Sequence, residues 1–302
     1  MHSAYRDNPR LELRARCVAR TGAGGGAFRA SGRYLSVEGR CIFLFDHGAG
    51  PPLLFLHGIP TFSYVWRNVL PPLAPRWRCL APDLLGFGYS EKPGGARFGV
   101  ARQAEIVTGL LDELGIDRAA VVAHDFGALV AAELLARQPA RVASLVLTNT
   151  SLRRQQWRSG PPLSLLRLPL LGELAMTLAR RWMLKLAMRI YVSDDARLTP
   201  EVMAHYWWPF QHGFKRTLLA LSRQRWAGED DFARWRTALA GMAAPALIVW
   251  GGRDPTFTLD EADDLAALLP HARLEVLPGA NHFLQEDAPA ALAALVAAHL
   301  AT

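Results

Sequence analysis

The sequence predicts an α/β fold with a mostly parallel central sheet and helices on both of its faces. Three observations predict it: short apolar runs recur along the chain, helical stretches lie between them, and polar residues follow most of the runs. Apolar runs with little polar alternation are typical of strands buried on both faces of a sheet. Strands that alternate with helices favour one open, mostly parallel sheet.

The strands are expected in two groups. A hairpin at residues 33–37 and 41–46, turned at Glu38-Gly39, comes first. The buried strands are expected at residues 52–56, 78–81, 119–123, 141–148, 245–250 and 273–277. Helices are expected at residues 62–70, 102–114, 126–138, 259–269 and 288–300.

One long stretch breaks this alternation. Residues 151–240 are rich in Leu, Arg and Trp, have a helical pattern and contain no run typical of a buried strand. We therefore predict a helical cap at residues 151–240, inserted into a core of residues 34–150 and 241–302. Residues 1–33, with their glycine-rich run at 21–27, are expected to form a flexible tail.

The composition is that of a globular protein, with 51% hydrophobic and 20% charged residues. The net charge of +7 is uneven, because residues 1–40 carry +5 and residues 151–240 carry +8. No nucleic-acid recognition motif accompanies this charge, so we interpret it as a solvated basic surface and expect no nucleic-acid partner. No uninterrupted apolar run reaches the roughly 20 residues of a transmembrane helix, so no integral membrane span is expected.

The three cysteines, Cys17, Cys41 and Cys79, are odd in number, widely spaced and without a CxxC pair. This pattern predicts neither a disulfide framework nor a zinc site. It favours a reducing compartment, and with no secretory signal visible a cytoplasmic location is expected. The histidines lack metal-ligand spacing, so we expect neither a metal nor an organic cofactor. The sequence does not indicate an oligomeric state.

Polar residues that follow the strands supply the candidate chemistry, because ligands of open α/β sheets bind at the carboxyl ends of the strands. The segment 123–127, AHDFG, has the small-x-nucleophile-x-small form of a nucleophile elbow, with Asp125 at its centre. Asp254 follows the 245–250 run and His282 follows the 273–277 run. This predicts a nucleophile, an orienting acid and a base. The alternative interpretation of Asp125 is a helix N-cap.

Two backbone N–H groups are candidates for an oxyanion hole. Gly58 lets the chain turn so that the N–H of Ile59 can face the site. The N–H of Phe126 lies at the start of a helix, where unpaired donors favour negative charge. The alternative is an ordinary turn that ends the strand. Ile59–Pro60 is also a candidate cis peptide bond.

Four segments carry a family resemblance: 55–61 (FLHGIPT), 83–90 (DLLGFGYS), 124–127 (HDFG) and 282–287 (HFLQED). They resemble the haloalkane dehalogenase and epoxide hydrolase branch of the α/β hydrolases, over residues 34–300. The resemblance implies the α/β-hydrolase fold with a helical cap and an aspartate nucleophile. Asp254, together with Asn149 after the preceding strand, is also similar to one dehalogenase subgroup. The chain order nucleophile, acid, histidine is the one that this fold uses.

The sequence departs from both branches at the leaving-group site. Phe126 stands where dehalogenases usually have a tryptophan whose indole N–H holds the halide, and Ile59 stands where many have asparagine. Epoxide hydrolases use cap tyrosines to protonate the ring oxygen. Leu221 stands roughly where such a tyrosine is expected, which leaves Tyr191 and Tyr206 as substitutes.

A carboxylate that attacks saturated carbon forms an ester, which the same site can hydrolyse. We therefore expect Asp125 to displace a leaving group, and His282, oriented by Asp254, to activate water. The first hypothesis is a haloalkane dehalogenase-like hydrolase with a small-to-medium apolar substrate. The alternatives are an epoxide or strained-lactone hydrolase, and a ligand-binding member of the fold with little turnover.

The cap is expected to roof the site with apolar side chains, because it holds six of the nine tryptophans. The expected substrate contacts are Tyr206, Trp207, Trp208 and Phe210. The alternative is that these aromatics only join the cap to the body.

Overall fold

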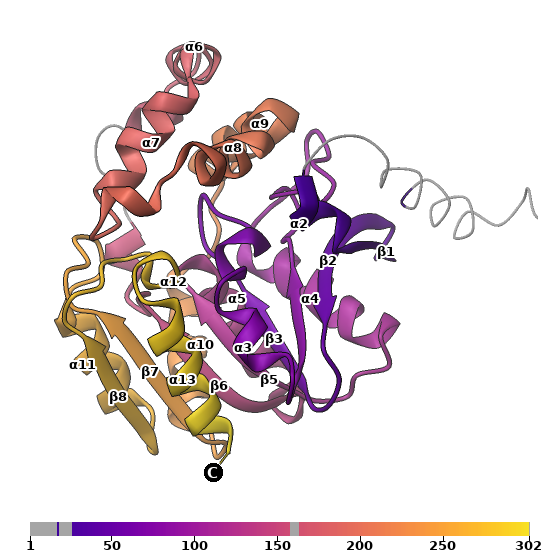
Figure 1. Ribbon diagram of the computed structural model, residues 1–302, viewed down its shortest axis with the longest axis vertical. Coiled ribbons are helices and arrows are strands. Elements are labelled where there is room, and N and C mark those ends of the chain that lie inside the picture. The colour runs from indigo at the N-terminus through magenta and orange to yellow at the C-terminus, as the bar shows by residue number, and fades with distance from the viewer. Residues whose placement is uncertain (1–16, 18–25, 158–162, 302) are drawn as a thin grey trace, which may run out of the picture.

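The computed structural model describes residues 17, 26–157 and 163–301, and it has one eight-stranded sheet at its centre (Figure 1). The strands are β1 (Arg33–Val37), β2 (Arg40–His47), β3 (Pro52–Leu56), β4 (Arg78–Pro82), β5 (Ala119–His124), β6 (Val142–Thr148), β7 (Ala246–Gly251) and β8 (Ala272–Leu277). Their order in the sheet is β1-β2-β4-β3-β5-β6-β7-β8. The pairs from β4 to β8 are parallel, whereas β2 pairs antiparallel with both β1 and β4. The predicted α/β fold is confirmed.

Helices cover both faces of the sheet. The core helices are α3 (Leu70–Leu73), α4 (Val100–Glu113), α5 (Phe126–Arg137), α10 (Glu229–Ala240), α11 (Leu259–Leu268), α12 (Leu284–Asp287) and α13 (Pro289–Leu300). Side chains of β3 alternate between the faces: Leu54 and Leu56 pack with residues of α4 and α5, whereas Leu53 and Phe55 pack with residues of α3 and α13. Since both sets are buried, the strand needs apolar residues at successive positions, which is why it appears as an uninterrupted apolar run.

Two element predictions differ from the structure. Residues 62–70 form two short pieces, the 3-10 turn η2 (Ser63–Trp66) and α3, because Pro71 and Pro72 begin a new helical turn and cannot continue one. The run 273–277 is a strand, but it is only half-buried, since β8 pairs with β7 alone and forms the edge of the sheet. The predicted hairpin is present, and Glu38 and Gly39 both have positive φ, as a tight turn between twisted strands requires.

The region before β1 also differs from the prediction. Residues 26–30 form a short helix, α2 (Gly26–Ala30), and the Phe28 ring stacks on Phe45, so this part of the expected flexible tail packs against the body. Residues 1–16 and 18–25 of the expected tail lie outside the described residues. The prediction of no disulfide is wrong, because Cys17 and Cys41 are bonded with their Cα atoms 5.3 Å apart. Spacing along the sequence does not reveal such proximity, and the bond removes the argument from cysteine usage for a reducing compartment.

The insert between β6 and β7 contains no strand within its described residues. It comprises the short turns η4 (Arg154–Trp157), η5 (Leu163–Arg167) and η6 (Asp195–Arg197), helices α6 (Leu171–Leu178), α7 (Arg181–Arg189), α8 (Pro200–Pro209) and α9 (Lys215–Arg223), and the π-turn η7 (Phe210–Phe214). Figure 1 shows α6 to α9 together at one end of the molecule, beyond the sheet. The last helix of the predicted cap, α10, instead packs beside core helix α5, where the Trp235 indole donates to the Glu133 carboxylate. No helix in the described part of the chain is long and apolar enough to cross a membrane.

Candidate active site

Asp125 lies in the tight turn between β5 and α5. Its φ of 51° and ψ of −122° place it in a conformation that L-residues rarely adopt, which is typical of a nucleophile elbow. The turn depends on small neighbours, since a Cβ on Gly127 would lie 2.4 Å from the Leu56 carbonyl oxygen. Asp125 makes no side-chain capping bond to α5, so the N-cap interpretation is not supported.

The carboxylate of Asp125 faces the two predicted backbone donors. The Ile59 N–H donates to Asp125 Oδ1 at 2.8 Å, and the Phe126 N–H also interacts with this carboxylate. Gly58 allows the approach, because a Cβ there would lie 2.4 Å from Asp125 Oδ1. The Ile59–Pro60 bond is cis, as predicted. Burial raises the pKa of Asp125 above its ordinary value, although His282 and the two N–H groups act to lower it.

His282 and Asp254 form a buried hydrogen-bonded pair. His282 Nδ1 donates to Asp254 Oδ2 at 2.8 Å, which leaves Nε2 as the ring nitrogen that can accept a proton. Asn149 donates to the same Asp254 oxygen at 2.7 Å, and the backbone N–H groups of Thr256 and Phe257 donate to the other oxygen. The Asp254 carboxylate is thus held in one orientation and holds the imidazole in turn.

The charges of this pair shift both pKa values. Burial alone would raise the pKa of Asp254, but the charge of His282 and the donated hydrogen bonds lower it below the ordinary value. Burial alone would lower the pKa of His282, but the Asp254 carboxylate, helped by Asp125, raises it above the ordinary value. His282 is therefore a stronger base than a free imidazole, and it lies close enough to Asp125 for the two charges to interact.

Aromatic side chains surround these residues. Tyr191 and Phe257 lie against the His282 ring, with centroids 5.6 and 5.8 Å away. Trp226 meets the Phe126 ring edge-on at 5.5 Å, and Trp157 bridges Trp226 and Phe257. Both tryptophans belong to the predicted cap but were not expected at the site, because nothing in the local sequence distinguishes them from the other four tryptophans of the predicted cap.

Residues 51–289 match the family model described as alpha/beta hydrolase fold. The chain belongs to the α/β-hydrolase fold family. It is a haloalkane dehalogenase-like hydrolase, similar to proteins named for this activity.

Two similar proteins are named haloalkane dehalogenases, and a third is named for a different hydrolase activity. Haloalkane dehalogenase 2 of Mycobacterium tuberculosis is 31% identical over 274 residues, covering 86% of this chain and 91% of that protein. The crystal structure of haloalkane dehalogenase DbeA from Bradyrhizobium elkani has a TM-score of 0.79 and 32% identity, covering 90% of this chain and 97% of that one. A 2-hydroxymuconate semialdehyde hydrolase of Pseudomonas is 30% identical, covering 89% of this chain and 94% of that protein.

Two other polar residues of the strand ends have separate roles in this hydrolase. Asp83 accepts hydrogen bonds from the N–H groups of Ser63 and Tyr89, and burial raises its pKa to about 6. It therefore fixes neighbouring loops. The His124 ring lies 4.7 Å from that of His282, and burial together with the His282 charge lowers its pKa well below the ordinary value. A neutral His124 lets a second imidazole pack here without a second positive charge.

The loop that carries His282 is tied to the cap. The Asn281 side chain donates to the Ile190 carbonyl at 3.1 Å, and the Phe283 N–H donates to the Tyr191 carbonyl at 3.0 Å. Asp287 accepts from the N–H groups of both Ser193 and Asn281, at 2.9 and 2.7 Å. These hydrogen bonds join the cap residues that follow α7 to the loop that carries His282.

The predicted substrate contacts lie along the seam between cap and body. Trp208 packs on Tyr89, and Trp207 stacks on Phe210. Tyr206 donates its hydroxyl to Glu286, which is also held by two hydrogen bonds of 2.6 Å from Arg67. Within the described residues, the rings that contact the His282 ring belong to other residues, and none of these four is among them. Their contact with substrate stays a prediction.

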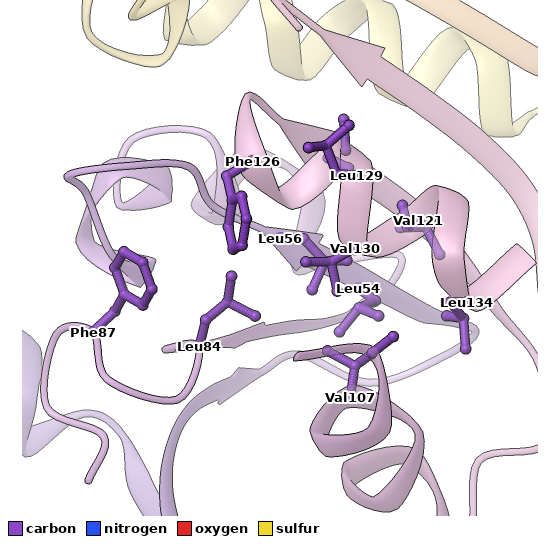
Figure 2. Close-up of a cluster of buried hydrophobic side chains, with 14 of the residues drawn as sticks. Leu54, Leu56, Leu84, Phe87, Val107, Val121, Phe126, Leu129, Val130 and Leu134 are labelled. Atoms are coloured by element: carbon purple, nitrogen blue, oxygen red, sulfur yellow. The ribbon is translucent and has the colours of Figure 1, made fainter. Parts of the chain in front are cut away.

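Phe126 points into the core and not into an open site. It is fully buried, and Figure 2 shows its ring directed towards Leu84 and Phe87. Phe87 in turn packs on Phe214 of the cap, with centroids 5.2 Å apart. The side chain at this position therefore joins core to cap by packing.

A cavity of about 450 Å³ lies along the same seam, lined by Tyr64, Arg67, Asn68, Ala196, Arg197, Thr199, Glu201, Val202 and Glu286. Its lining contains no residue of the predicted triad and is largely polar. We therefore associate the chemistry with Asp125 and His282 and not with this cavity.

Proposed function

We propose that this hydrolase uses Asp125 as a nucleophile on saturated carbon. One Asp125 carboxylate oxygen forms a bond to the carbon, the bond to the leaving group breaks, and the leaving group departs with the electron pair. The product is an ester between substrate and Asp125. Such an ester is an ordinary one, which the same site can hydrolyse, whereas attack on a carbonyl would give a reactive anhydride.

Hydrolysis of the ester is assigned to His282. Its Nε2 removes a proton from a water molecule, and that water attacks the carboxyl carbon of Asp125. The imidazolium that forms is stabilised by Asp254, and the N–H groups of Ile59 and Phe126 stabilise the oxyanion. The observation that carries the proposal is the 2.8 Å bond from the Ile59 N–H to Asp125 Oδ1, because it places the carboxylate where its own tetrahedral intermediate needs a donor.

The first candidate leaving group is a halide, on a small-to-medium apolar substrate. The similarity to proteins named haloalkane dehalogenase supports it. The aromatic rings of Trp157, Tyr191, Trp226 and Phe257 support an apolar substrate, because a dry surrounding strengthens attack by a carboxylate.

A second candidate is the opening of a strained ring, such as an epoxide or lactone, and one observation favours it. Trp226, which packs on Phe126, and Trp157, which packs on Trp226, already use their indole N–H groups. Trp226 donates to the Leu221 carbonyl at 2.6 Å and Trp157 to the Ser151 carbonyl at 2.9 Å. Neither can hold a halide without losing that bond. A ring opener needs an acid for the ring oxygen instead, and Tyr191 is the phenol beside His282.

Trapping the ester tests the proposal. The His282→Gln variant, incubated with a haloalkane or an epoxide that the wild type consumes, is expected to accumulate an adduct on the peptide that contains Asp125. The mass separates the two candidates, because halide displacement adds the substrate without its halogen and ring opening adds the whole substrate.

The control for trapping is Asp125→Asn/His282→Gln, which should carry no adduct. An adduct on any other residue, or none in His282→Gln with a substrate that the wild type turns over, contradicts the proposed nucleophile. Binding of both substrate classes without any product from the wild type would favour a ligand-binding protein.

A further inference from the structure

The exposed apolar side chains of this protein are concentrated on one part of the cap. Of the twelve large hydrophobic residues exposed in the described structure, ten lie between residues 165 and 190. We call them the apolar cap face: Leu165, Leu168, Leu170, Leu171, Leu174, Leu178, Trp182, Met183, Leu186 and Ile190. Scattered exposed hydrophobics are normal on a protein surface, but a contiguous group of this kind marks an interaction site.

Helix α7 shows how this face is built. Leu184 and Met188 are buried and hold the helix on the protein. Trp182, Leu186 and Ile190 follow one another at four-residue spacing on the opposite side and point away from it, and Trp182 is 66% exposed. The helix thus has two apolar stripes, of which only one has a partner within the described chain.

Helix α6 continues the face. Leu171, Leu174 and Leu178 share one side of this helix and are all exposed. Leu170, just before it, is 82% exposed. Its φ of 67° lies in the left-handed region, which disfavours a leucine. Figure 1 shows α6 and α7 at the extreme end of the molecule, farthest from the sheet.

Basic side chains flank the apolar cap face. Arg181, Lys185 and Arg189 follow one another at four-residue spacing, one position before the exposed stripe of α7. Residues 163–190 contain five basic residues and one acid, Glu173, for a net charge of +4. Glu173 already pairs with Arg223, and Arg189 pairs with Asp195, whereas Arg181 and Lys185 pair with no carboxylate of the described residues.

We propose that the apolar cap face docks this protein on an anionic phospholipid membrane. Helix α7, with Trp and Leu on one side and Arg and Lys beside them, has the pattern of segments that lie in the membrane interface, and the exposed leucines of α6 extend its apolar side. The apolar side chains enter the headgroup region, and the flanking cations interact with anionic lipids. Helices of eight and nine residues lie in the interface and do not cross it.

Charge decides between a membrane and a second copy of this chain. A symmetric dimer places the same patch of both copies face to face. Each copy brings a net charge of +4 in residues 163–190, so Arg181 and Lys185 of one copy would lie near basic residues of the other. An anionic surface removes this repulsion and turns the same residues into favourable contacts.

The apolar cap face also adjoins the proposed active site. Ile190 belongs to the face, and its carbonyl accepts the Asn281 hydrogen bond, while the next residue, Tyr191, lies against His282. An apolar substrate dissolved in the membrane would therefore meet the cap at Ile190, which is next in sequence to Tyr191 at the proposed active site. This last point rests on the proposed function; the docking itself does not.

Vesicle sedimentation tests the docking without any turnover. The full chain is mixed with vesicles of phosphatidylcholine, or of phosphatidylcholine with phosphatidylserine, at low and at physiological salt. We expect binding to the vesicles with phosphatidylserine, weakened by salt, together with a blue shift of tryptophan fluorescence as Trp182 leaves water.

Two pairs of variants identify the surface. Arg181→Glu/Lys185→Glu should weaken binding about thirty-fold or more, from about 1 kcal/mol for each basic residue near an anionic surface. Trp182→Ser/Leu186→Ser should weaken it about ten-fold or more. The controls, Arg76→Glu/Arg118→Glu and Leu259→Ser, reverse two charges and replace one apolar side chain by serine at exposed positions of the body, and they should leave binding unchanged.

Three outcomes overturn the proposal: no binding to either vesicle at low salt, equal losses in the cap and control variants, or a wild type that self-associates through Trp182 and Leu186. The last would assign the face to a second copy. If one variant does not fold, as judged by circular dichroism, the other pair still decides. Failure of docking would leave the proposed chemistry untouched, because no turnover is measured.

Discussion

The strand ends of the core and the outer helices of the cap differ in which side chains they bury and which they expose. At the strand ends, Asp125, Asp254 and His282 are buried charged or polar groups, each with hydrogen-bond partners. On α6 and α7, leucines and a tryptophan are exposed without partners in the described chain. The core buries polar and charged groups that water would otherwise hydrate, whereas the cap exposes apolar side chains, which water hydrates poorly.

We propose that the two regions carry different parts of the function. The positions of Asp125 and His282 follow from strand order and tight turns. The cap supplies the aromatic rings beside the site and the surface that faces outwards, which determine what the protein meets. The leaving-group position, Phe126, lies between them and packs against both.

We expect the largest loss of turnover from a substitution at the strand ends of the core. Asp125→Ala removes the proposed nucleophile, so turnover should fall by about four orders of magnitude or more. The fold should persist, because the hydrogen bonds of this carboxylate within the described residues come from the backbone N–H groups of Ile59 and Phe126 alone. Steady-state kinetics with any substrate of the wild type measures the loss. Activity within ten-fold of the wild type in a folded variant would mean that the strand ends do not carry the chemistry.

Asp254→Asn is expected to slow turnover by about two to four orders of magnitude and to move its pH dependence. His282 acts as a base only when neutral, so activity rises with pH through its pKa. Burial lowers that pKa and the Asp254 carboxylate raises it, with a net rise. Removing the carboxylate charge lowers the pKa, so the acid limb should move to lower pH. The pH–rate profile of ester hydrolysis measures this, and an unmoved or raised limb contradicts the pairing.

The seam between the regions gives the next prediction. Glu286 is buried and joins Arg67 of the core side to Tyr206 of α8. Glu286→Ala leaves the half-buried Arg67 guanidinium without its partner and should lower the free energy of unfolding by about 3 kcal/mol or more. Urea denaturation measures it.

The matched control for the seam is Glu105→Ala at an exposed ion pair with Arg102, where the expected loss is below about 1 kcal/mol. Equal losses at both sites would show that the seam is not fastened by Glu286.

The smallest effect should separate two kinds of cap tryptophan. Trp226 lies against Phe126, whereas Trp207 packs on Phe210 in the seam. We expect Trp226→Ala to lower kcat/KM for an apolar substrate about ten-fold, through lost apolar contact, and Trp207→Ala to lower it less. Steady-state kinetics of both variants decides. A larger loss of kcat/KM in Trp207→Ala than in Trp226→Ala would instead support the seam residues as the substrate contacts.

The sequence predicted the strand ends better than the cap. Buried parallel strands need apolar residues at successive positions, so their ends, and with them Asp125, Asp254 and His282, are visible as breaks in apolar runs. Trp157 and Trp226 could not be assigned in this way, because their places beside Phe257 and Phe126 depend on how the cap folds back over the body. The Cys17–Cys41 bond was missed for the same reason, since proximity in space leaves no mark in spacing.

The edge position of β8 was also missed. The run 273–277 was predicted as a buried strand, yet β8 has a neighbour on one side only, and Arg273 and Glu275 interrupt its apolar residues. The exposed stripe of α7 is the reverse case: its spacing fits a helix packed on both sides, and only the structure shows that one side has no partner in the described chain.

Single turnover in water enriched in oxygen-18 tests directly whether Asp125 is the nucleophile. Enzyme in excess over substrate should place the first label on Asp125 and not on the product, because the product takes its oxygen from the carboxylate and water replaces that oxygen. Mass spectrometry of the peptide that contains Asp125 should show one oxygen exchanged, with unlabelled product. Labelled product and an unlabelled Asp125 peptide would mean that water attacks the substrate directly, and would contradict the account.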